Sequence, residues 1–125
     1  MRNHVREGRA GERYAAKALE EAGMRILASN FRSRRGEVDL VAQDGDTIAF
    51  IEVKTWASQG IAGLEYSVGN EKQRRIIETA KYFLVGHREY NEMAIRFDVI
   101  FIENKLSSPV KPVIHYLASA FVECV

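Results

Sequence analysis

The feature that most constrains the fold is a pair of short strands that the sequence predicts at 37–42 and 47–55. Side chains alternate between two classes along both segments, and the residues between them, Asp44, Gly45 and Asp46, have the composition of a tight turn. Two strands joined by such a turn form an antiparallel hairpin. The sequence therefore predicts a β-hairpin that contributes to the centre of the fold.

Alternation assigns the side chains of this hairpin to two faces. One face is wholly apolar and must be buried, with Val38, Leu40, Ala42, Ala49, Ile51 and Val53. The other face is apolar near the turn, but its far end carries Glu37, Asp39, Glu52 and Lys54. A mixed face of this kind predicts that a helix covers one half of it and that the other half opens into a polar cleft.

The position of the turn decides whether Asp39 and Glu52 meet. A two-residue turn at 44–45 sets Asp39 opposite Phe50, whereas a turn at 45–46 sets it directly opposite Glu52. Both registers leave the two acids on one face, where directly opposite Cβ atoms are about 4.5–5.5 Å apart. A three-residue loop without a bulge would instead place them on opposite faces of the sheet.

Two carboxylates at that separation repel each other unless a cation or a proton lies between them. Oxygen ligands suit a hard divalent ion, for which we expect Mg²⁺ or Mn²⁺. Lys54 lies about 6.6–6.8 Å beyond Glu52 on the same face, within reach of a metal-bound water or a phosphate oxygen. This set suits metal-assisted hydrolysis of a phosphodiester. Acid-x-lysine is a common pattern, however, and Glu103-Asn104-Lys105 repeats it without a partnering aspartate.

Helices are predicted on both sides of the hairpin in the sequence. Residues 7–22 have apolar residues at helical spacing, and Gly23 suits the position just beyond a helix C-terminus. Asn70 is predicted to cap a second helix, with Gln73 three residues on completing a capping box. That helix extends to about residue 85.

Strands at 24–31, 94–102 and 110–117 are predicted to join the hairpin in one sheet. The expected fold class is α/β, with a mixed central sheet of about five strands flanked by helices, in the order α-β-β-β-α-β-β. The length is that of one domain, so a single domain over 1–125 is expected.

Charge is distributed unevenly along a chain whose net charge is only +1. Residues 1–35 carry nine Lys/Arg and four Asp/Glu, residues 36–69 carry one Lys and six acids, and residues 70–88 carry five Lys/Arg and two acids. A solvated mixed surface accounts for this pattern, and so does an acidic site flanked by phosphate-facing cations. The candidates for phosphate contacts are Arg32, Arg34, Arg35, Lys72, Arg74 and Arg75.

No apolar run approaches the ~20 residues that a membrane span needs, so no membrane partner is expected. The N-terminal segment lacks the apolar core of a secretory signal. The single cysteine, Cys124, cannot form an internal disulfide. These features predict a cytoplasmic protein.

Asp39 followed by Glu52-Val53-Lys54 resembles the PD-(D/E)XK nuclease core, with valine where that motif has proline. A wider set of motifs resembles the uncharacterised bacterial YraN-like family, itself similar to Holliday-junction resolvases of the restriction-endonuclease-like fold. These motifs are Gly11-Glu12, Asn30-Phe31-Arg32, Gly36-Glu37-Val38-Asp39-Leu40, Phe50-Ile51-Glu52-Val53-Lys54-Thr55 and Lys72-Gln73-Arg74-Arg75. The resemblance implies that fold, a divalent metal, and nucleic acid as partner, most readily DNA.

The resemblance also implies roles for single residues. Asp39, Glu52 and the backbone carbonyl of Val53 would bind the metal, and Lys54 would orient the attacking water. Glu12 would contribute to metal binding from the first helix, or would be an ordinary surface glutamate.

Two further positions have alternative interpretations. Gln73 would complete the catalytic site, or serve only in the capping box. Trp56 stands where the family often has arginine, so it would stack on an unpaired base or simply pack.

The functional expectation is a Mg²⁺- or Mn²⁺-dependent endonuclease that hydrolyses phosphodiester bonds in DNA, including branched or flapped DNA. The alternatives are a nucleic-acid-binding module of the same fold without turnover, and a structural partner subunit. A chain of this size offers little surface to grip a branched substrate, which favours a homodimer.

Overall fold

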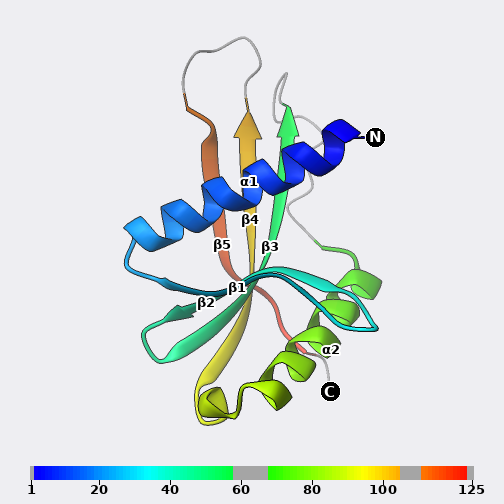
Figure 1. The fold of residues 1–125 in the computed structure, drawn as a ribbon, viewed down its shortest axis with the longest axis vertical. Coiled ribbons are helices and arrows are strands. Elements are labelled where there is room, and N and C mark those ends of the chain that lie inside the picture. Colours follow the sequence, from blue (N-terminus) through cyan, green and yellow to red (C-terminus); the bar gives the residue numbers. More distant parts are fainter. Residues whose placement is uncertain (1, 58–67, 105–110, 124–125) are drawn as a thin grey trace.

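The computed structural model describes residues 2–57, 68–104 and 111–123 (Figure 1). The helices are α1 (Arg2–Glu21) and α2 (Asn70–Gly86), with one 3-10 turn, η1 (Arg88–Tyr90). The strands are β1 (Arg25–Arg32), β2 (Glu37–Asp44), β3 (Thr47–Ala57), β4 (Ala94–Asn104) and β5 (Val113–Phe121). The predicted α/β class and the order α-β-β-β-α-β-β are confirmed.

All five strands form one mixed sheet in the order β1-β2-β3-β4-β5. Strands β3 and β4 are parallel, and the other neighbouring pairs are antiparallel. Parallel neighbours need a crossover connection, and α2 belongs to the segment that makes it. Figure 1 shows α1 lying across one face of the sheet, while α2 packs at the opposite end of the molecule.

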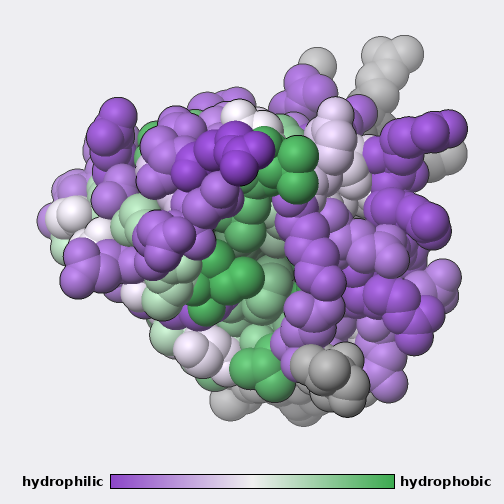
Figure 2. Space-filling view, turned by 90° about the horizontal axis from the view of Figure 1, so that it is seen from below, coloured by the Kyte–Doolittle hydropathy of each residue, from purple (hydrophilic) through white to green (hydrophobic). Residues whose placement is uncertain are grey.

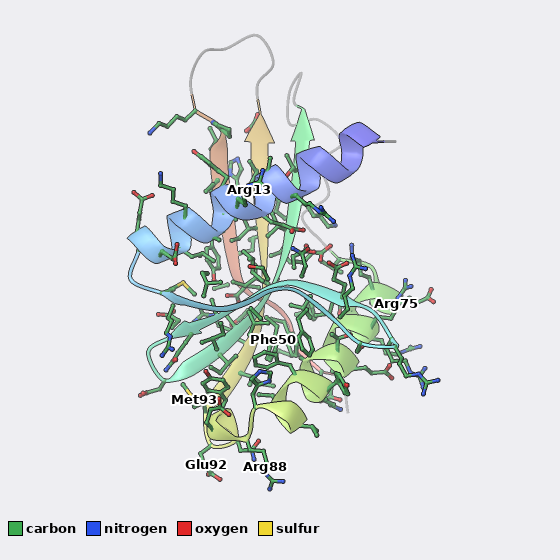
Figure 3. All side chains as sticks on the ribbon, viewed as in Figure 1. Arg13, Phe50, Arg75, Arg88, Glu92 and Met93 are labelled. Carbon is green, nitrogen blue, oxygen red and sulfur yellow. The ribbon has the colours of Figure 1, made fainter. Side chains whose placement is uncertain are left out.

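A hydrophobic cluster fills the space on each side of the sheet. The cluster beneath α1 contains Ala15, Leu19, Leu40, Ala42, Ala49, Ile51, Ile100 and Ile102. The larger cluster beneath α2 includes Val41, Ile48, Phe50, Ile76, Ala80, Phe83, Phe97, Val99 and Phe101. Phe50 lies near its centre (Figure 3). Both faces of the hairpin are therefore buried near the turn, as alternation predicts.

The lower face of the molecule is mostly hydrophilic, with a band of hydrophobic residues through its middle (Figure 2). Val85 and Val122 are among the large hydrophobic residues that remain exposed. Neither helix, over the residues described, combines the length and apolar character that crossing a membrane requires.

The end of α1 follows its predicted chemistry. Gly23 has a φ of 97°, and its N–H donates to the Glu20 carbonyl at 3.0 Å. The N–H of Met24 donates to the Leu19 carbonyl at 2.9 Å. This pair of bonds is a Schellman motif, in which glycine supplies the left-handed residue. It reverses the chain, and β1 follows.

The start of α2 differs from its prediction. Gly69 occupies the N-cap position and makes no side-chain cap, so Gln73 is the fourth residue of the helix and not the third. The Gln73 amide instead donates to the Val68 carbonyl at 2.6 Å. The predicted capping box between Asn70 and Gln73 is therefore wrong.

Gly11 allows α1 to approach β3 closely. A Cβ atom added to Gly11 would overlap the hydroxyl oxygen of Thr55, while its next neighbour, the Ile102 Cδ1, would be 3.5 Å away. The side chain of the next residue, Glu12, interacts with Asp39 of the hairpin. The glycine thus allows α1 to lie close enough to β3 for Glu12 to reach Asp39, at the end of the hairpin far from its turn.

Gly11→Ala is expected to destabilise the protein by about 1–3 kcal/mol through overpacking, although alanine is the better helix former. The same change should cost much less in the Thr55→Ala background, because the overlapping oxygen is gone. Urea unfolding of the four proteins of this cycle measures the difference. An equal cost in both backgrounds would show that the Thr55 contact is not what requires glycine.

Candidate functional site

The β2–β3 ladder ends where the candidate acids begin. The hairpin turns at 45–46, and its pairing continues to Leu40 opposite Ile51. Of the two predicted registers, this is the one that directs Asp39 toward Glu52. Beyond Leu40 and Ile51 the two strands no longer pair, so the sheet forks at Asp39.

The side chain of Asp39 lies in this fork. Its Oδ2 accepts a hydrogen bond from the backbone N–H of Val53 at 2.8 Å, in place of a ladder bond. The N–H and C=O of one strand residue point toward the same neighbouring strand. The Val53 carbonyl, the predicted backbone ligand, therefore faces the same gap as the Asp39 carboxyl.

The fork also changes the face on which Val38 lies. Alternation predicts Val38 on the same side as Leu40, but Val38 packs beneath α2 and Leu40 beneath α1. On the neighbouring strand, Asn30 has a left-handed φ of 54°, which asparagine tolerates better than most residues. The prediction for Val38 is wrong because alternation holds only along an uninterrupted pleat.

Three acids from three elements interact at the fork: Glu12 of α1, Asp39 of β2 and Glu52 of β3. Burial, and then the charge of Glu52, raise the pKa of Asp39 to about 9, against the Val53 hydrogen bond. Burial also raises the pKa of Glu12, while hydrogen bonds with Asn30 and Asp39 oppose the rise. At neutral pH Asp39 therefore keeps a proton, which its carboxyl can donate to Glu52.

Positive charge reaches the acids from α2. Glu52 is only 5% exposed and forms an ion pair with Lys72. The Oε1 atom of Glu12 is buried and has no hydrogen-bond partner in the described part of the chain. In this arrangement, no three His, Cys, Asp or Glu side chains of residues 2–57, 68–104 and 111–123 are grouped as metal ligands. The Lys72 ammonium and the Asp39 proton compensate the acids instead.

The acids open into a cleft of about 320 Å³ between the hairpin and α2. It is lined by Gly36, Glu37, Asp39, Glu52, Lys72, Arg75 and Ile76. Arg75 projects from α2 (Figure 3). Two of the predicted phosphate contacts, Lys72 and Arg75, thus lie in the same cleft as Asp39 and Glu52.

Lys54 is half-buried on β3, two residues beyond Glu52. Its Nζ atom is 5.7 Å from the centroid of the Phe101 ring, a cation–π contact that holds the ammonium on the α2 side of the sheet. The backbone of Trp56 pairs with Glu103 on β4, but its side chain lies outside the described residues.

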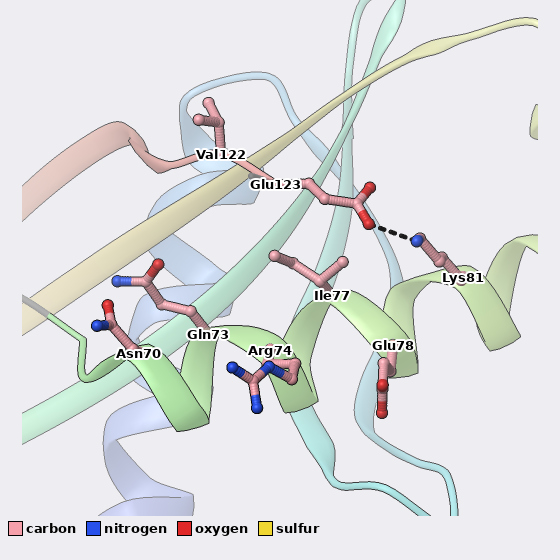
Figure 4. Close-up of a pocket in the computed structure, with 8 residues that line it drawn as sticks. All are labelled: Asn70, Gln73, Arg74, Ile77, Glu78, Lys81, Val122 and Glu123. Atoms are coloured by element: carbon pink, nitrogen blue, oxygen red, sulfur yellow. Dashed lines mark hydrogen bonds and ion pairs between the residues drawn. The ribbon is translucent and has the colours of Figure 1, made fainter. Parts of the chain in front are cut away.

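Gln73 and Arg74 are not brought to the acids. They line a separate groove of about 390 Å³ between α2 and the segment after β5, beside the Lys81–Glu123 ion pair (Figure 4). Successive residues of a helix are rotated by about 100°. Because Lys72 and Arg75 face the cleft, the two residues between them turn away from it.

The role of Asn30 at the site has a signal in the sequence that the alternation of the hairpin does not carry. Asparagine is unfavourable inside a strand, and here its left-handed backbone stands beside Asp39 while its side chain hydrogen-bonds to Glu12. The signal is an asparagine inside a predicted strand, when the neighbouring strand carries a candidate metal-binding acid. The Lys72–Glu52 ion pair has no such signal in the sequence, because it joins α2 to β3, and only the tertiary fold brings these two elements together.

Together, the fold and the site define an α/β protein with an acid cluster at a fork in its mixed sheet. Residues 11–102 match the family described as "Uncharacterised protein family UPF0102", and the chain belongs to that family. All the motifs quoted above fall within that range, and the predicted membership of the YraN-like family is confirmed.

Several relatives share this description. The chain is 50% identical over 97 residues to a UPF0102 protein of Treponema pallidum, covering 78% of this chain and 77% of the relative. It is 40% identical over 126 residues to one of Treponema denticola, covering 94% and 95%. The solved structure of Pyrococcus furiosus SfsA in complex with Ca²⁺ is a slight likeness: 18% identity, 97% of this chain, 65% of that chain, and a TM-score of 0.40.

Proposed function

We propose that this protein is a metal-dependent nuclease of the restriction-endonuclease-like class, which hydrolyses phosphodiester bonds in DNA at the fork. The observation that carries the proposal is the convergence of Glu12, Asp39 and Glu52 from three separate elements. Grouping three acids costs stability, so a fold that retains them has a use for the negative charge.

The donor atoms suit Mg²⁺ or Mn²⁺. Three carboxylates and the Val53 carbonyl offer only oxygen, which hard divalent ions prefer. The buried Oε1 of Glu12 has no hydrogen-bond partner among the described residues, so it can accept a metal ion as its partner. When bound, the metal would lower the pKa of a water molecule and stabilise charge on the phosphorus oxygens.

The residues of the chain have distinct roles in this proposal. Asp39, once deprotonated, and Glu52, once released from Lys72, would hold the metal. Lys72 and Arg75 then face the phosphate in the cleft. Lys54, held by the Phe101 ring, orients the attacking water.

One observation favours a second candidate, a DNA-binding module of the same fold without turnover. Glu52 already has a partner in Lys72. If that ion pair persists when DNA binds, the acids serve to position Lys72 and no metal enters.

Cleavage of labelled DNA tests the proposal. Single-stranded, duplex, flap and four-way substrates are incubated with Mn²⁺ or with EDTA. We expect metal-dependent cleavage of at least one substrate by the wild type and none by Glu52→Gln. The matched control is Glu20→Gln, which changes an exposed glutamate of α1 and should cleave like the wild type.

Salt-dependent binding without cleavage of any substrate would contradict the nuclease and leave the binding module. Cleavage that Glu52→Gln retains would place the chemistry elsewhere. Failure to bind any of these DNAs would contradict both candidates.

A further inference from the structure

The turn between β1 and β2 is held against α2 by uncharged contacts. The Ser33 hydroxyl is hydrogen-bonded at 2.8 Å to the hydroxyl of Thr79, a residue with no exposed surface. The N–H of Ser33 donates to the Gly36 carbonyl at 2.8 Å, and the N–H of Arg35 donates to the Ser33 hydroxyl at 3.1 Å. The backbone of residues 33–36 is therefore fixed, and its arginines project from a rigid support.

This turn and α2 form the walls of an open hollow of about 630 Å³, lined by Arg32, Ser33, Arg34, Arg35, Glu78 and Tyr82. Among the residues that the structure describes, the arginines of the hollow make only long ion pairs or none. Arg32 is 3.7 Å from Glu37, Arg35 is 3.5 Å from Glu78, and Arg34 has no ion pair within the described residues. Solvated pairs at these distances contribute little stability, so all three guanidinium groups can bind an anion.

Tyr82 presents an aromatic ring to the same hollow. It is 61% exposed, although a ring of this size is usually more buried. Its inner side lies against Phe31, with ring centroids 6.0 Å apart, and Phe31 packs edge-on against Phe83 at 5.1 Å. The ring is thus supported from the core and open toward solvent, as a stacking platform requires.

We propose that this hollow binds one unpaired nucleotide of the DNA substrate. A nucleotide combines a flat base, which stacks on Tyr82, with a phosphate, which the arginines bind. Glu78 can accept a hydrogen bond from an exocyclic amino group of the base. A base within an intact duplex has both faces stacked on its neighbours, so only an unpaired or extruded base reaches Tyr82.

The hollow and the acid cleft are neighbours along the turn between β1 and β2. Arg35 lines the hollow, and the next residue, Gly36, lines the cleft. In this proposal, the DNA backbone runs from a nucleotide stacked on Tyr82, past Gly36, to a phosphate beside Asp39 and Glu52. The inference builds on the proposed function, because it selects DNA with a single-stranded segment next to the cleavage site.

Metal-free binding tests this inference separately from catalysis. The probes are a fluorescent single strand of roughly 12 nucleotides and a blunt duplex of the same length, both in EDTA. Tyr82→Ala is expected to weaken single-strand binding about tenfold, because loss of one base stack costs ~1–3 kcal/mol. Duplex binding should change much less, and Tyr82→Phe should behave like the wild type. Val85→Ala, an exposed apolar residue on the same helix, is the matched control.

The arginines are tested through salt dependence. Arg34→Gln is expected to reduce the slope of log affinity against log salt by about 1. Arg25→Gln, at the opposite end of β1, should leave that slope unchanged. Ultraviolet cross-linking of a strand that contains 5-iododeoxyuridine should attach the base to Tyr82.

The inference is overturned if Tyr82→Ala binds the single strand as the wild type does, or weakens single-strand and duplex binding equally. Tyr82-dependent binding by a protein that cleaves nothing would support this site and contradict the nuclease. Glu52-dependent cleavage with no effect of Tyr82→Ala on binding would support the nuclease and contradict the nucleotide site at Tyr82.

Discussion

Asp39→Asn is expected to stabilise the metal-free protein and to weaken its binding of Mg²⁺ and Mn²⁺. The asparagine oxygen can accept the Val53 N–H as the Asp39 Oδ2 does at 2.8 Å. Its amide can donate to Glu52, which an ionised Asp39 would repel. We expect a gain in unfolding free energy on the order of 1–3 kcal/mol near pH 8.

The size of this gain should depend on pH. The pKa of Asp39 rises from 3.8, its ordinary value, to about 9 in the folded protein. Between these values the folded state binds a proton that the unfolded chain has released, so stability falls as pH rises. The contribution of Asp39 to stability is complete below about pH 4 and is lost as pH approaches 9. The advantage of Asp39→Asn should therefore widen from pH 5 to pH 8.

Urea unfolding in EDTA at the two pH values measures this advantage. Asp46→Asn, an exposed residue in the turn of the same hairpin, is the matched control and should show no such trend. A constant difference between Asp39→Asn and the wild type would mean that Asp39 is not held protonated beside Glu52.

The other large effect is expected at Asp98, a fully buried residue of β4. Its carboxylate accepts hydrogen bonds from Arg96 at 2.9 Å, from the Tyr116 hydroxyl at 2.5 Å and from the Ser119 N–H at 2.8 Å. Burial, and then the bond to Asp98, raise the pKa of Tyr116 to about 12. These three donors satisfy the hydrogen-bonding capacity of the buried Asp98 carboxylate.

Asp98 also determines the path of β5. The β4–β5 register shifts between Phe97 and Val99, and Ser119 has a left-handed φ of 53°. Asp98→Ala would remove the fully buried partner of the half-buried Arg96 guanidinium, and would leave the Tyr116 hydroxyl and the Ser119 N–H of the irregular strand without their acceptor. We expect a loss of about 3–5 kcal/mol, or roughly 10–20 °C in Tm.

Asp44→Ala is the matched control, because Asp44 bonds the same guanidinium at 2.9 Å from a side chain that is 48% exposed. Its loss should be within about 1 kcal/mol. Thermal and urea unfolding compare the two variants. Equal losses would show that burial does not make Asp98 the dominant partner of Arg96.

The parts of the fold that depend on local chemistry could be predicted from the sequence. Gly23 ends α1 through its own backbone conformation, and the 45–46 turn is one of two registers that the hairpin allows. That register brings Asp39 level with Glu52 along the strands, although the pairing itself ends one residue earlier, at Leu40 and Ile51. Such features need only neighbouring residues and the two-residue period of a strand.

The remaining features depend on tertiary packing. Val38 changes face because the pleat of β2 is interrupted at Asp39, where pairing with β3 ends, and alternation carries no signal of that. Gln73 and Arg74 turn away from the acids because α2 places Lys72 and Arg75 in the cleft. In the sequence Tyr82 is an ordinary helix residue, and only the tertiary fold places the turn at 33–36 beside it.

The proposed function requires that Glu12, Asp39 and Glu52 form a site for one divalent cation. Calorimetric titration of Mn²⁺ into the EDTA-stripped protein tests it most directly. We expect one ion per chain with proton release for the wild type and Asp46→Asn, and binding at least about tenfold weaker for Asp39→Asn. Absence of binding by the wild type, or equal binding by Asp39→Asn, would contradict it.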